Sequence, residues 1–377
     1  MQICICRIRV EYVKLEEICT IVSGGTPSRS KPNYWNNGNI PWIKIKDMKS
    51  KYIDSAEEFI TEEGLNNSST KMLKRDTILY SIFATLGEVG ILKIDACTNQ
   101  AIAGLSLKED SNILKEYLYY YLKSKKKDVN NLGRGVAQNN INLSLLRKFK
   151  IPVIPLRQQK KIIEVLDNVS STINNYEREL ALLDELVKAR FVEMFGDPVS
   201  NSRDLPVQKM NNVAPICQYD GSFEESVWLL NLDMIESQTG RIINYNIVSK
   251  DVIGGSVCTF DENNVLYSKL RPYLNKVVIP DGKGYATSEL VPLRPDPKII
   301  NRIYLAYLLR SNEFVEMIKE KVAGAKMPRV SMSDFREFNV PVPPLELQNQ
   351  FASFVQEIDK SRLLSNHSLF LTKSIIF

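Results

Sequence analysis

Apolar residues recur in alternating steps of four and three along the segment that follows Pro155. Such a heptad pattern places one apolar stripe along an α-helix, and that stripe packs against another helix. The pattern therefore predicts a coiled-coil helix over about Leu156 to Phe195, roughly 60 Å long at 1.5 Å per residue, which Gly196 and Pro198 end. The stripe consists of Ile162, Leu166, Val169, Ile173, Tyr176, Leu180, Leu183 and Val187.

A weaker copy of this stripe follows Pro344. Two of its later positions hold Arg362 and Ser365, so the second helix is predicted to be the poorer partner. Each helix leaves one globular region and must reach the other, which predicts that the two helices are antiparallel neighbours. Phe351, Val355 and Ile358 match the first three positions of the first stripe, and Leu369 and Ile376 match two later ones.

The segments around the helices repeat as well. Residues 149–156 with Gln159 return as residues 338–345 with Gln348, and residues 78–81 return as 265–268. A repeat of half the chain indicates two domains of one kind rather than a solenoid unit. A molecule with an internal near two-fold axis suits a partner that is itself two-fold related, and duplex DNA is such a partner.

The predicted fold is therefore α+β with an internal pseudo-two-fold repeat. Two similar strand-rich domains are separated by long antiparallel coiled-coil helices. The predicted boundaries are residues 1–154 for the first domain, 155–198 for the first helix, 199–343 for the second domain and 344–377 for the second, shorter helix.

Charge and composition narrow the function only a little. The net charge of +5 and the pI of about 8.7 permit nucleic acid as a partner without requiring it. One histidine and six scattered cysteines make a zinc site implausible and predict free thiols in a reducing cytoplasm. Neither a secretory signal nor an apolar run of membrane-spanning length is recognisable, so no membrane partner is predicted.

No catalytic or nucleotide-binding pattern stands out. Residues 24–31 look faintly like a phosphate-binding loop, but they lack its spacing and contain Pro27. No G-x-G-x-x-G follows a strand, and the carboxylate pairs at 57–58 and 62–63 are interpreted as a solvated face. The chain is predicted to bind rather than to catalyse, with no metal or cofactor of its own.

Binding signals are stronger. In the first domain, cations and amides are concentrated before residues 40–42, and Arg or Lys can pair with guanine while Asn or Gln can pair with adenine. An Asn-rich turn over a packed aromatic residue is the structural alternative, and it stays open. The candidate DNA-binding residues are Thr26, Ser28, Arg29, Lys31, Asn33, Trp35, Lys44, Lys46 and Gln100, with Arg134, Gln138 and Asn139 in the loop before the first Pro-rich hinge at residues 151–156.

In the second domain the most basic loop is at residues 268–273. It aligns with residues 81–88, which contain no cation, so the two domains are predicted to read different sequences. A second flexible loop with cations precedes the second hinge, as in the first half. The candidate DNA-binding residues of this domain are Ser268, Lys269, Arg271, Tyr273, Lys326 and Arg329.

In order and duplication, these segments resemble the specificity subunit of type I restriction–modification enzymes. The resemblance covers nearly the whole chain, and its motifs are weak singly but specific in their order. They are residues 21–27, 40–42 and 98–101, the hinge at 151–156 with Gln159, and residues 195–198 and 343–348. The second helix departs from the family pattern, because its last turns fit the stripe poorly.

The resemblance implies a non-catalytic DNA reader whose two target-recognition domains each read one part of a split site. The helices would form a spacer and a docking surface for two modification subunits, which bind S-adenosylmethionine and methylate adenine. Restriction subunits, which are motor nucleases that use ATP and Mg, would complete the complex. Two other functions stay open: a methyltransferase or nuclease with its own active site, and a coiled-coil scaffold that binds no DNA.

Overall fold

The computed structural model of the 377-residue chain describes residues 11–133, 141–323 and 327–376. The chain forms two compact units. The N-terminal unit contains residues 1–175 and 370–377, and the C-terminal unit contains residues 176–369. The long helix α6 (Leu156–Phe195) begins in the first unit and ends in the second.

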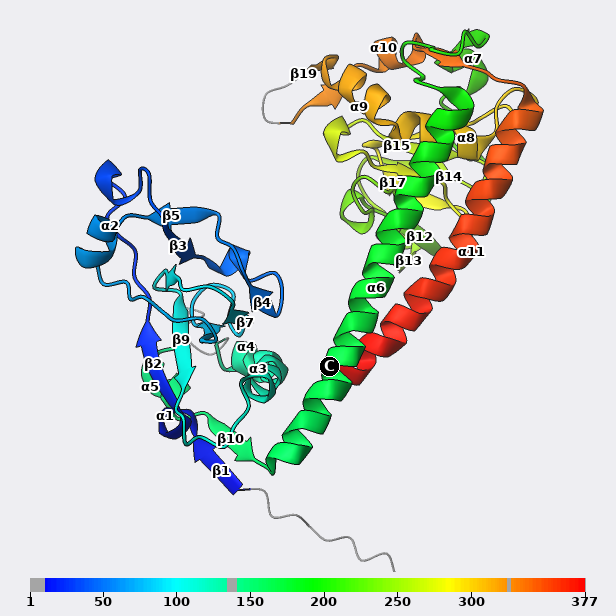
Figure 1. Cartoon of the computed structure of the whole chain (residues 1–377). Coiled ribbons are helices and arrows are strands. Elements are labelled where there is room, and N and C mark those ends of the chain that lie inside the picture. Colours follow the sequence, from blue (N-terminus) through cyan, green and yellow to red (C-terminus); the bar gives the residue numbers. More distant parts are fainter. Residues whose placement is uncertain (1–10, 134–140, 324–326, 377) are drawn as a thin grey trace, which may run out of the picture. The chain divides into compact units, whose positions relative to one another are not determined.

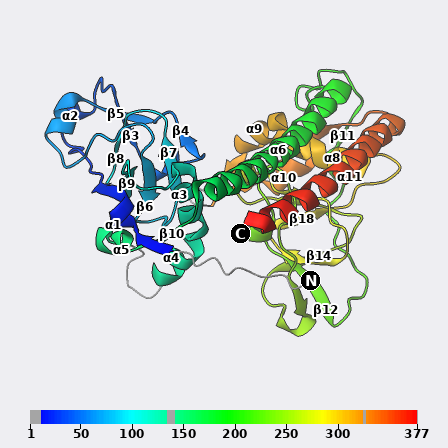
Figure 2. The ribbon, with the colours of Figure 1, turned by 60° about the horizontal axis from the view of Figure 1, so that its bottom comes forward.

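The N-terminal unit holds a five-stranded sheet in the order β2-β9-β6-β7-β4 and a three-stranded sheet in the order β5-β3-β8. The larger sheet consists of β2 (Cys19–Ser23), β9 (Ile102–Leu107), β6 (Ile78–Ser81), β7 (Val89–Leu92) and β4 (Tyr52–Ile53). The smaller sheet consists of β5 (Glu58–Ile60), β3 (Ile40–Ile43) and β8 (Cys97–Thr98). Figures 1 and 2 show β3, β5 and α2 (Glu62–Asn66) at the end of this unit opposite to β1 (Glu11–Lys14) and β10 (Lys150–Val153).

The C-terminal unit repeats the core of this arrangement. Its sheets have the orders β16-β15-β18 and β13-β12-β17-β14. Their strands are β12 (Ser226–Leu230), β13 (Ile247–Ser249), β14 (Val257–Phe260), β15 (Val265–Ser268), β16 (Val277–Val278), β17 (Gly284–Thr287) and β18 (Leu290–Leu293). The parallel pair β3 and β8 corresponds to β12 and β17, and the antiparallel pair β6 and β9 corresponds to β15 and β18.

Strand register gives the equivalence of the two units residue by residue. Ser81 faces Ile102 in the first unit as Ser268 faces Leu290 in the second. The same comparison makes Ile43 equivalent to Leu230. The two tryptophans Trp42 and Trp228 are therefore not equivalent, because they differ by one position of the register. The 3₁₀ turns that follow, Ile45–Asp47 and Leu232–Met234, are capped by the equivalent residues Lys44 and Asn231.

Short helices and a second strand pair occupy the hinge end of each unit. Strand β1 pairs with β10, and β11 (Val207–Lys209) pairs with β21 (Asn339–Pro341), both antiparallel. The helices of the first unit are α1 (Leu15–Ile18), α3 (Lys115–Ser124), α4 (Lys126–Gly133) and α5 (Leu143–Arg147). Those of the second are α7 (Met210–Val213), α8 (Arg302–Arg310), α9 (Asn312–Lys319) and α10 (Met332–Arg336), with the short strands β19 (Val322–Ala323) and β20 (Arg329–Val330).

The repeated glutamines Gln159 and Gln348 explain why the hinge is duplicated so closely. Both side chains are fully buried. The amide oxygen of Gln159 accepts from the Leu114 N–H at 2.8 Å, and that of Gln348 accepts from the Asn301 N–H at 2.8 Å. Because a buried amide must be hydrogen-bonded, each glutamine ties the first turn of a long helix to the start of the short helix beside it.

The long helices match the prediction in extent and direction. Helix α6 begins and ends at the predicted residues, and α11 spans Leu345–Ile376. Within the C-terminal unit the pair is antiparallel, because Phe191 packs on Phe351 while Leu183, further back on α6, accepts a hydrogen bond from Arg362, further along α11. Both views show the two helices side by side in this region (Figures 1 and 2).

The two ends of α6 are buried to different extents. Val187, Phe191 and Phe195 belong to the main core of the C-terminal unit. At the other end, Leu166 is only partly buried against the core of the N-terminal unit, beside Ile163. Ile162, a predicted stripe residue, is 38% exposed, so at this turn Ile163 takes its place against the first core.

Candidate nucleic-acid interface

Arg29 and Trp35 form the centre of a candidate surface on the N-terminal unit. The guanidinium carbon of Arg29 lies 3.5 Å from the centre of the Trp35 ring, a cation–π contact. Trp35 packs edge-on against the buried Trp42, with ring centres 5.1 Å apart, and its N–H donates to the Ser28 carbonyl at 3.1 Å. The packed aromatic residue Trp35 and the exposed cation Arg29 are thus in contact, so the structural alternative and the binding interpretation both apply to this loop.

Two carboxylates hold the cations of this surface. Arg29 Nη2 donates to Glu58 Oε2 at 2.5 Å, and Lys44 Nζ donates to the other oxygen of the same carboxylate. Lys46 pairs with Glu57 in the same way. Glu58 lies on β5 opposite Trp42 on β3, so the strand pairing itself brings the carboxylate to Lys44.

The earlier interpretation of this carboxylate pair as a solvated face is wrong for Glu58. Its side chain is 32% exposed and is engaged by two cations. Burial raises the pKa of Glu58, but the hydrogen bonds from Lys44 and Arg29 outweigh burial and leave the pKa below its ordinary value. The hydrogen bond from Lys46 lowers the pKa of Glu57. Both groups are therefore charged at neutral pH.

The remaining candidates of the first domain surround this centre, and each has a contact within the unit. Their contacts are Thr26 to Gln100, the Ser28 hydroxyl to that of Ser30 at 2.8 Å, Lys31 Nζ to Tyr34 Oη at 2.9 Å and Asn33 Nδ2 to Glu63 Oε1 at 2.6 Å. Gln100 lies two residues after β8, so Thr26 links the loop after β2 to the turn between β8 and β9. The structure thus brings these residues together on neighbouring loops.

In the C-terminal unit, three predicted cations meet where β15, β18 and β20 come together. The Lys269 N–H donates to the Glu289 carbonyl at 3.0 Å, and the Arg271 N–H donates to the Pro328 carbonyl at 2.8 Å. Arg329 follows Pro328 directly, so main-chain hydrogen bonds fix the loop of the basic cluster against the loop before the hinge. Arg271 and Arg329 are exposed and Lys269 is half-buried.

Glu289 is the acidic member of this cluster. Arg329 grips it bidentately, with Nη2 2.7 Å from Oε1 and Nε 3.1 Å from Oε2. The hydrogen bond from Arg329 lowers the pKa of Glu289, and the charge of Lys269 adds to this effect. Fork-to-carboxylate pairing of this kind fixes the guanidinium plane.

Ser268 and Tyr273 lie differently. Ser268 is buried, and its hydroxyl donates to the Leu270 carbonyl at 2.9 Å. This inward position does not fit its predicted role as a DNA contact. Tyr273 is exposed in the 3₁₀ turn Pro272–Leu274, which follows Arg271 in a left-handed conformation with φ of 49°.

Four other predicted contacts cannot be placed in this geometry. Arg134, Gln138, Asn139 and Lys326 lie outside the described residues.

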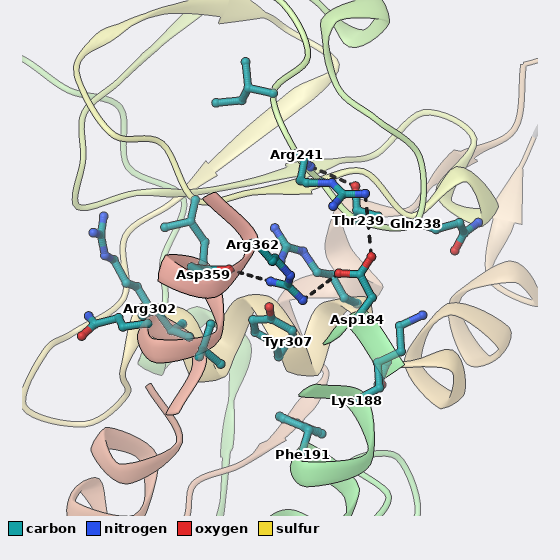
Figure 3. A pocket seen from close by; sticks show the side chains of 18 of the residues that line it. Asp184, Lys188, Phe191, Gln238, Thr239, Arg241, Arg302, Tyr307, Asp359 and Arg362 are labelled. Atoms are coloured by element: carbon teal, nitrogen blue, oxygen red, sulfur yellow. Dashed lines mark hydrogen bonds and ion pairs between the residues drawn. The ribbon is translucent and has the colours of Figure 1, made fainter. Parts of the chain in front are cut away.

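A cavity of about 580 Å³ lies inside the C-terminal unit, between the long helices and loops of the strand-rich part. Its centre is Asp184 on α6, which accepts from Arg362 on α11 at 2.7 Å and lies 3.7 Å from Arg241 (Figure 3). Arg362 also pairs with Asp359 at 2.6 Å. One carboxylate thus joins α6, α11 and a loop of the strand-rich part, at the polar position Arg362 of the second stripe.

The stripe itself becomes polar in the next turn of α11. Ser365, a buried seam residue, donates to Glu179 of α6 at 3.0 Å. The apolar stripe residues Val187, Phe351 and Val355 are buried, and Ile358 packs against the same core. Within residues 11–133, 141–323 and 327–376, no group of three or more metal-ligating side chains and no helix able to cross a membrane is found.

The comparison with known families gives these surfaces a context. The family described as Type I restriction modification DNA specificity domain matches residues 8–184 and 233–369. The chain belongs to this family. It is a DNA specificity subunit of a type I restriction–modification system, a non-catalytic member of such a complex. The resemblance and the fold class predicted from the sequence are confirmed.

Individual relatives agree with this membership. The chain is 34% identical to the specificity subunit of the Escherichia coli type I restriction enzyme EcoR124I/EcoR124II over 188 residues, which span 48% of this chain and 46% of that protein. It is 24% identical over 392 residues to the MjaIX specificity subunit of Methanocaldococcus jannaschii, covering 96% of this chain and 89% of the relative.

Solved structures show the same fold at low identity. A chain from a structural study of complex assembly and conformational transition of the type I R-M system matches 97% of this chain and 95% of its own length, with a TM-score of 0.59 and 15% identity. The S subunit from M. genitalium matches 98% of this chain and 95% of its own length, with a TM-score of 0.53 and 15% identity.

Sequence reasoning on this specificity subunit missed the acidic half of each surface. Glu58 and Glu289 are ordinary surface carboxylates by composition, and nothing in their neighbours along the chain marks them. Their cationic partners are distant in sequence: Arg29 is 29 positions from Glu58, and Arg329 is 40 positions from Glu289. The pairing of β5 with β3, which brings Glu58 to Lys44, is given by the structure and has no signal along the chain.

Proposed function

We propose that each unit of this specificity subunit reads one part of a bipartite DNA site. The single observation that carries the proposal is that the two units share their strand register while the charged residues stand on different loops. A shared scaffold presents loops in a similar way, and unshared loops select different bases. Cations position a protein on phosphates, and side chains at base edges supply the sequence information.

In the N-terminal unit the proposed readers are Arg29, Lys44, Lys46 and Gln100. Arginine and lysine recognise guanine O6 and N7, and glutamine recognises adenine N6 and N7. In the C-terminal unit the proposed readers are Lys269, Arg271 and Arg329, with Tyr273 as an exposed aromatic contact. Among the described candidates, Ser268 drops out of the set because its hydroxyl is buried and bonded within its own turn.

The helices are proposed as the spacer and as the docking surface for two modification subunits. Val187, Phe351 and Val355 of the stripe are buried and most of its other residues on α6 are partly buried, so the stripe suits the spacer role. Docking suits the exposed leucines instead: Leu363 and Leu364 are 71% and 72% exposed, and Leu182 is 53% exposed. Large apolar side chains that are exposed on the outer face of a helix pair indicate a binding surface.

The chemistry is proposed to reside on the partners. Modification subunits would bind S-adenosylmethionine and methylate adenine, and restriction subunits would use ATP and Mg. This chain would supply sequence recognition and geometry in the cytoplasm. Its described cysteines, Cys19, Cys97, Cys217 and Cys258, are all free thiols, which suits a reducing compartment.

A salt-dependent gel shift of the full chain with duplex DNA tests the DNA-binding part. Because phosphate contacts release counterions, the affinity is expected to fall linearly with the logarithm of salt concentration. A specific complex should also survive competition by unrelated duplex. Binding that is unaffected by salt, or equally sensitive to every competitor, would contradict the proposal.

The docking part is tested by replacing Leu363 and Leu364 together by glutamine, which keeps a helix-favouring residue at both positions. Co-purification of the modification subunit is expected to fall about tenfold or more, because the substitutions remove exposed apolar area from the proposed contact. Val252→Gln, at a residue 68% exposed in the second domain, is the matched control. Equal retention by the double variant and the control would remove these leucines from the docking surface.

A further inference from the structure

We propose that Glu58 determines the sequence selectivity of the N-terminal surface, by holding Arg29 and Lys44 away from DNA phosphates and in position for a base edge. This inference rests on the proposed DNA-reading role of that surface. It concerns a positioning residue, because Glu58 acts through the two cations that it binds.

The geometry fixes Arg29 from two directions. Its guanidinium lies against the Trp35 ring at 3.5 Å, and one of its terminal nitrogens donates to Glu58 at 2.5 Å. Glu58 stands on a paired strand, so its own main chain is held by β3. An arginine has five N–H donors in a planar fork, and these two contacts use one face of the plane and one of its donors. The remaining donors are pre-oriented for a bidentate acceptor such as guanine O6 and N7.

The charges decide between phosphate and base. Free lysines and arginines bind the phosphates of any duplex, and this attraction is independent of sequence. Glu58 neutralises part of the charge of Arg29 and Lys44 and would repel a phosphate placed beside them. A base edge carries no net charge, so Glu58 does not repel it in this way. Glu58 thus weakens binding to all sequences while sparing the contact that distinguishes one sequence.

The C-terminal unit also contains an arginine held by a carboxylate, at a different position of the repeat. Arg329 is held by Glu289 through both carboxylate oxygens, in the turn between β17 and β18. Glu58 lies on β5, which is not the equivalent position. A carboxylate grips a predicted reading arginine in each unit, although the two carboxylates occupy unrelated positions of the repeat. Duplication alone therefore does not account for the arrangement.

The test uses the full chain with Glu58→Gln and, as the matched control, Glu62→Gln. Glu62 is exposed on α2 of the same unit and loses the same charge on substitution, and its side chain makes no hydrogen bond or ion pair with the described residues. Affinity is measured against the duplex selected by the wild-type chain and against a scrambled duplex, over a series of KCl concentrations.

Glu58→Gln is expected to strengthen binding to the scrambled duplex and to reduce the ratio of specific to non-specific affinity about tenfold. The plot of log affinity against log salt should steepen by about 0.9 for each cation that is freed. Adding Arg29→Ala to Glu58→Gln should cancel most of the gain on the scrambled duplex. Glu62→Gln should leave the ratio within about twofold of wild type.

The failures are distinguishable. If the wild-type chain shows no preferred sequence in the part read by the N-terminal unit, the proposed function fails, whatever Glu58 does. If the wild type is selective and Glu58→Gln behaves like Glu62→Gln, the role of Glu58 is overturned and the DNA-reading function stands. If Glu58→Gln loses preference at a single cytosine without a change in salt slope, Glu58 reads a base directly, which also overturns the positioning role.

Discussion

The two recognition domains carry their charges on different loops of the same scaffold. Where the C-terminal unit has Lys269 and Arg271, the N-terminal unit has Ile82 and Ala84, at equivalent positions of the strand register. Ala84 and Arg271 even share the left-handed conformation, with φ of 61° and 49°. The backbone at this turn is therefore retained while its chemistry is exchanged.

The reverse exchange occurs after β3 and its equivalent β12. Lys44 and Lys46 follow β3 in the N-terminal unit, and the equivalent residues after β12 are Asn231 and Asp233. Each unit thus places its cations on a loop that is uncharged or acidic in the other. The comparison teaches that one scaffold can present cations on different loops. If these loops read DNA as proposed, the two domains would differ in where they read as well as in which base they read.

The largest expected effect is a loss of stability, and it tests the different burial of the two ends of α6. Phe191→Ala should destabilise the C-terminal unit by about 3–5 kcal/mol, because it leaves a cavity beside Phe195, Tyr304 and Phe351. Leu166→Ala, at a partly buried position, should lower the stability of the N-terminal unit by less. Scanning calorimetry on the full chain measures both.

The control for this pair is Val192→Ala, at an exposed residue beside Phe191 on the same helix. It should shift neither transition by more than a degree or so. Equal destabilisation of both units by Phe191→Ala would contradict the separate burial of the two helix ends.

Removing one reading cation is expected to act on one half of the site. Arg329→Ala should cost about 1–3 kcal/mol of discrimination at one base pair of the part read by the C-terminal unit, since a bidentate contact to guanine is lost. Arg271→Ala or Lys269→Ala should likewise alter only that part. Affinity is measured on duplexes with single base changes, with the exposed Arg336→Ala on α10 as the control. Loss of preference on both parts would defeat the assignment of these cations to one unit.

A charge can also be transplanted. Ala84→Arg would add a cation to the N-terminal unit at the place that Arg271 holds in the other, and the left-handed backbone already accepts a non-glycine residue there. We expect an unchanged melting temperature and a salt dependence of DNA binding that steepens by about 0.9. An unchanged salt slope would mean that this turn does not face DNA in the N-terminal unit.

The smallest expected effect is that of pH. The pKa values of Glu58 and Glu289 are both lowered from an ordinary value of 4.5. A carboxylate with a depressed pKa contributes its ion pair fully above the unfolded-state pKa and loses it only as pH falls through the lower folded-state value. Specificity of both parts is therefore expected to be constant between pH 6 and pH 8. A change within this range, measured by competition binding, would assign control to another group.

Local pattern carried the sequence predictions that succeeded. The extent of α6 follows from eight apolar positions in a 4–3 rhythm and from Gly196 after the last turn, both of which are readable along the chain. The repeat of Gln159 and Gln348 was readable along the chain, whereas their burial and hydrogen bonds were given by the structure. The carboxylates escaped because ion pairs such as Arg29 to Glu58 depend on strand pairing across a distance in sequence, and strand order has no local signal. The ion pair of Asp184 with Arg362 was missed for a different reason, because the stripe predicts apolar contacts between the helices only.

The most direct test of the central claim is selection of bound duplexes from a randomised pool by the full chain. The account predicts two short, unlike motifs separated by a gap of fixed length, with Arg29→Ala changing one motif and Arg329→Ala changing the other. One contiguous motif, two identical motifs or a variable gap would contradict the reading of DNA by two dissimilar units on a rigid spacer.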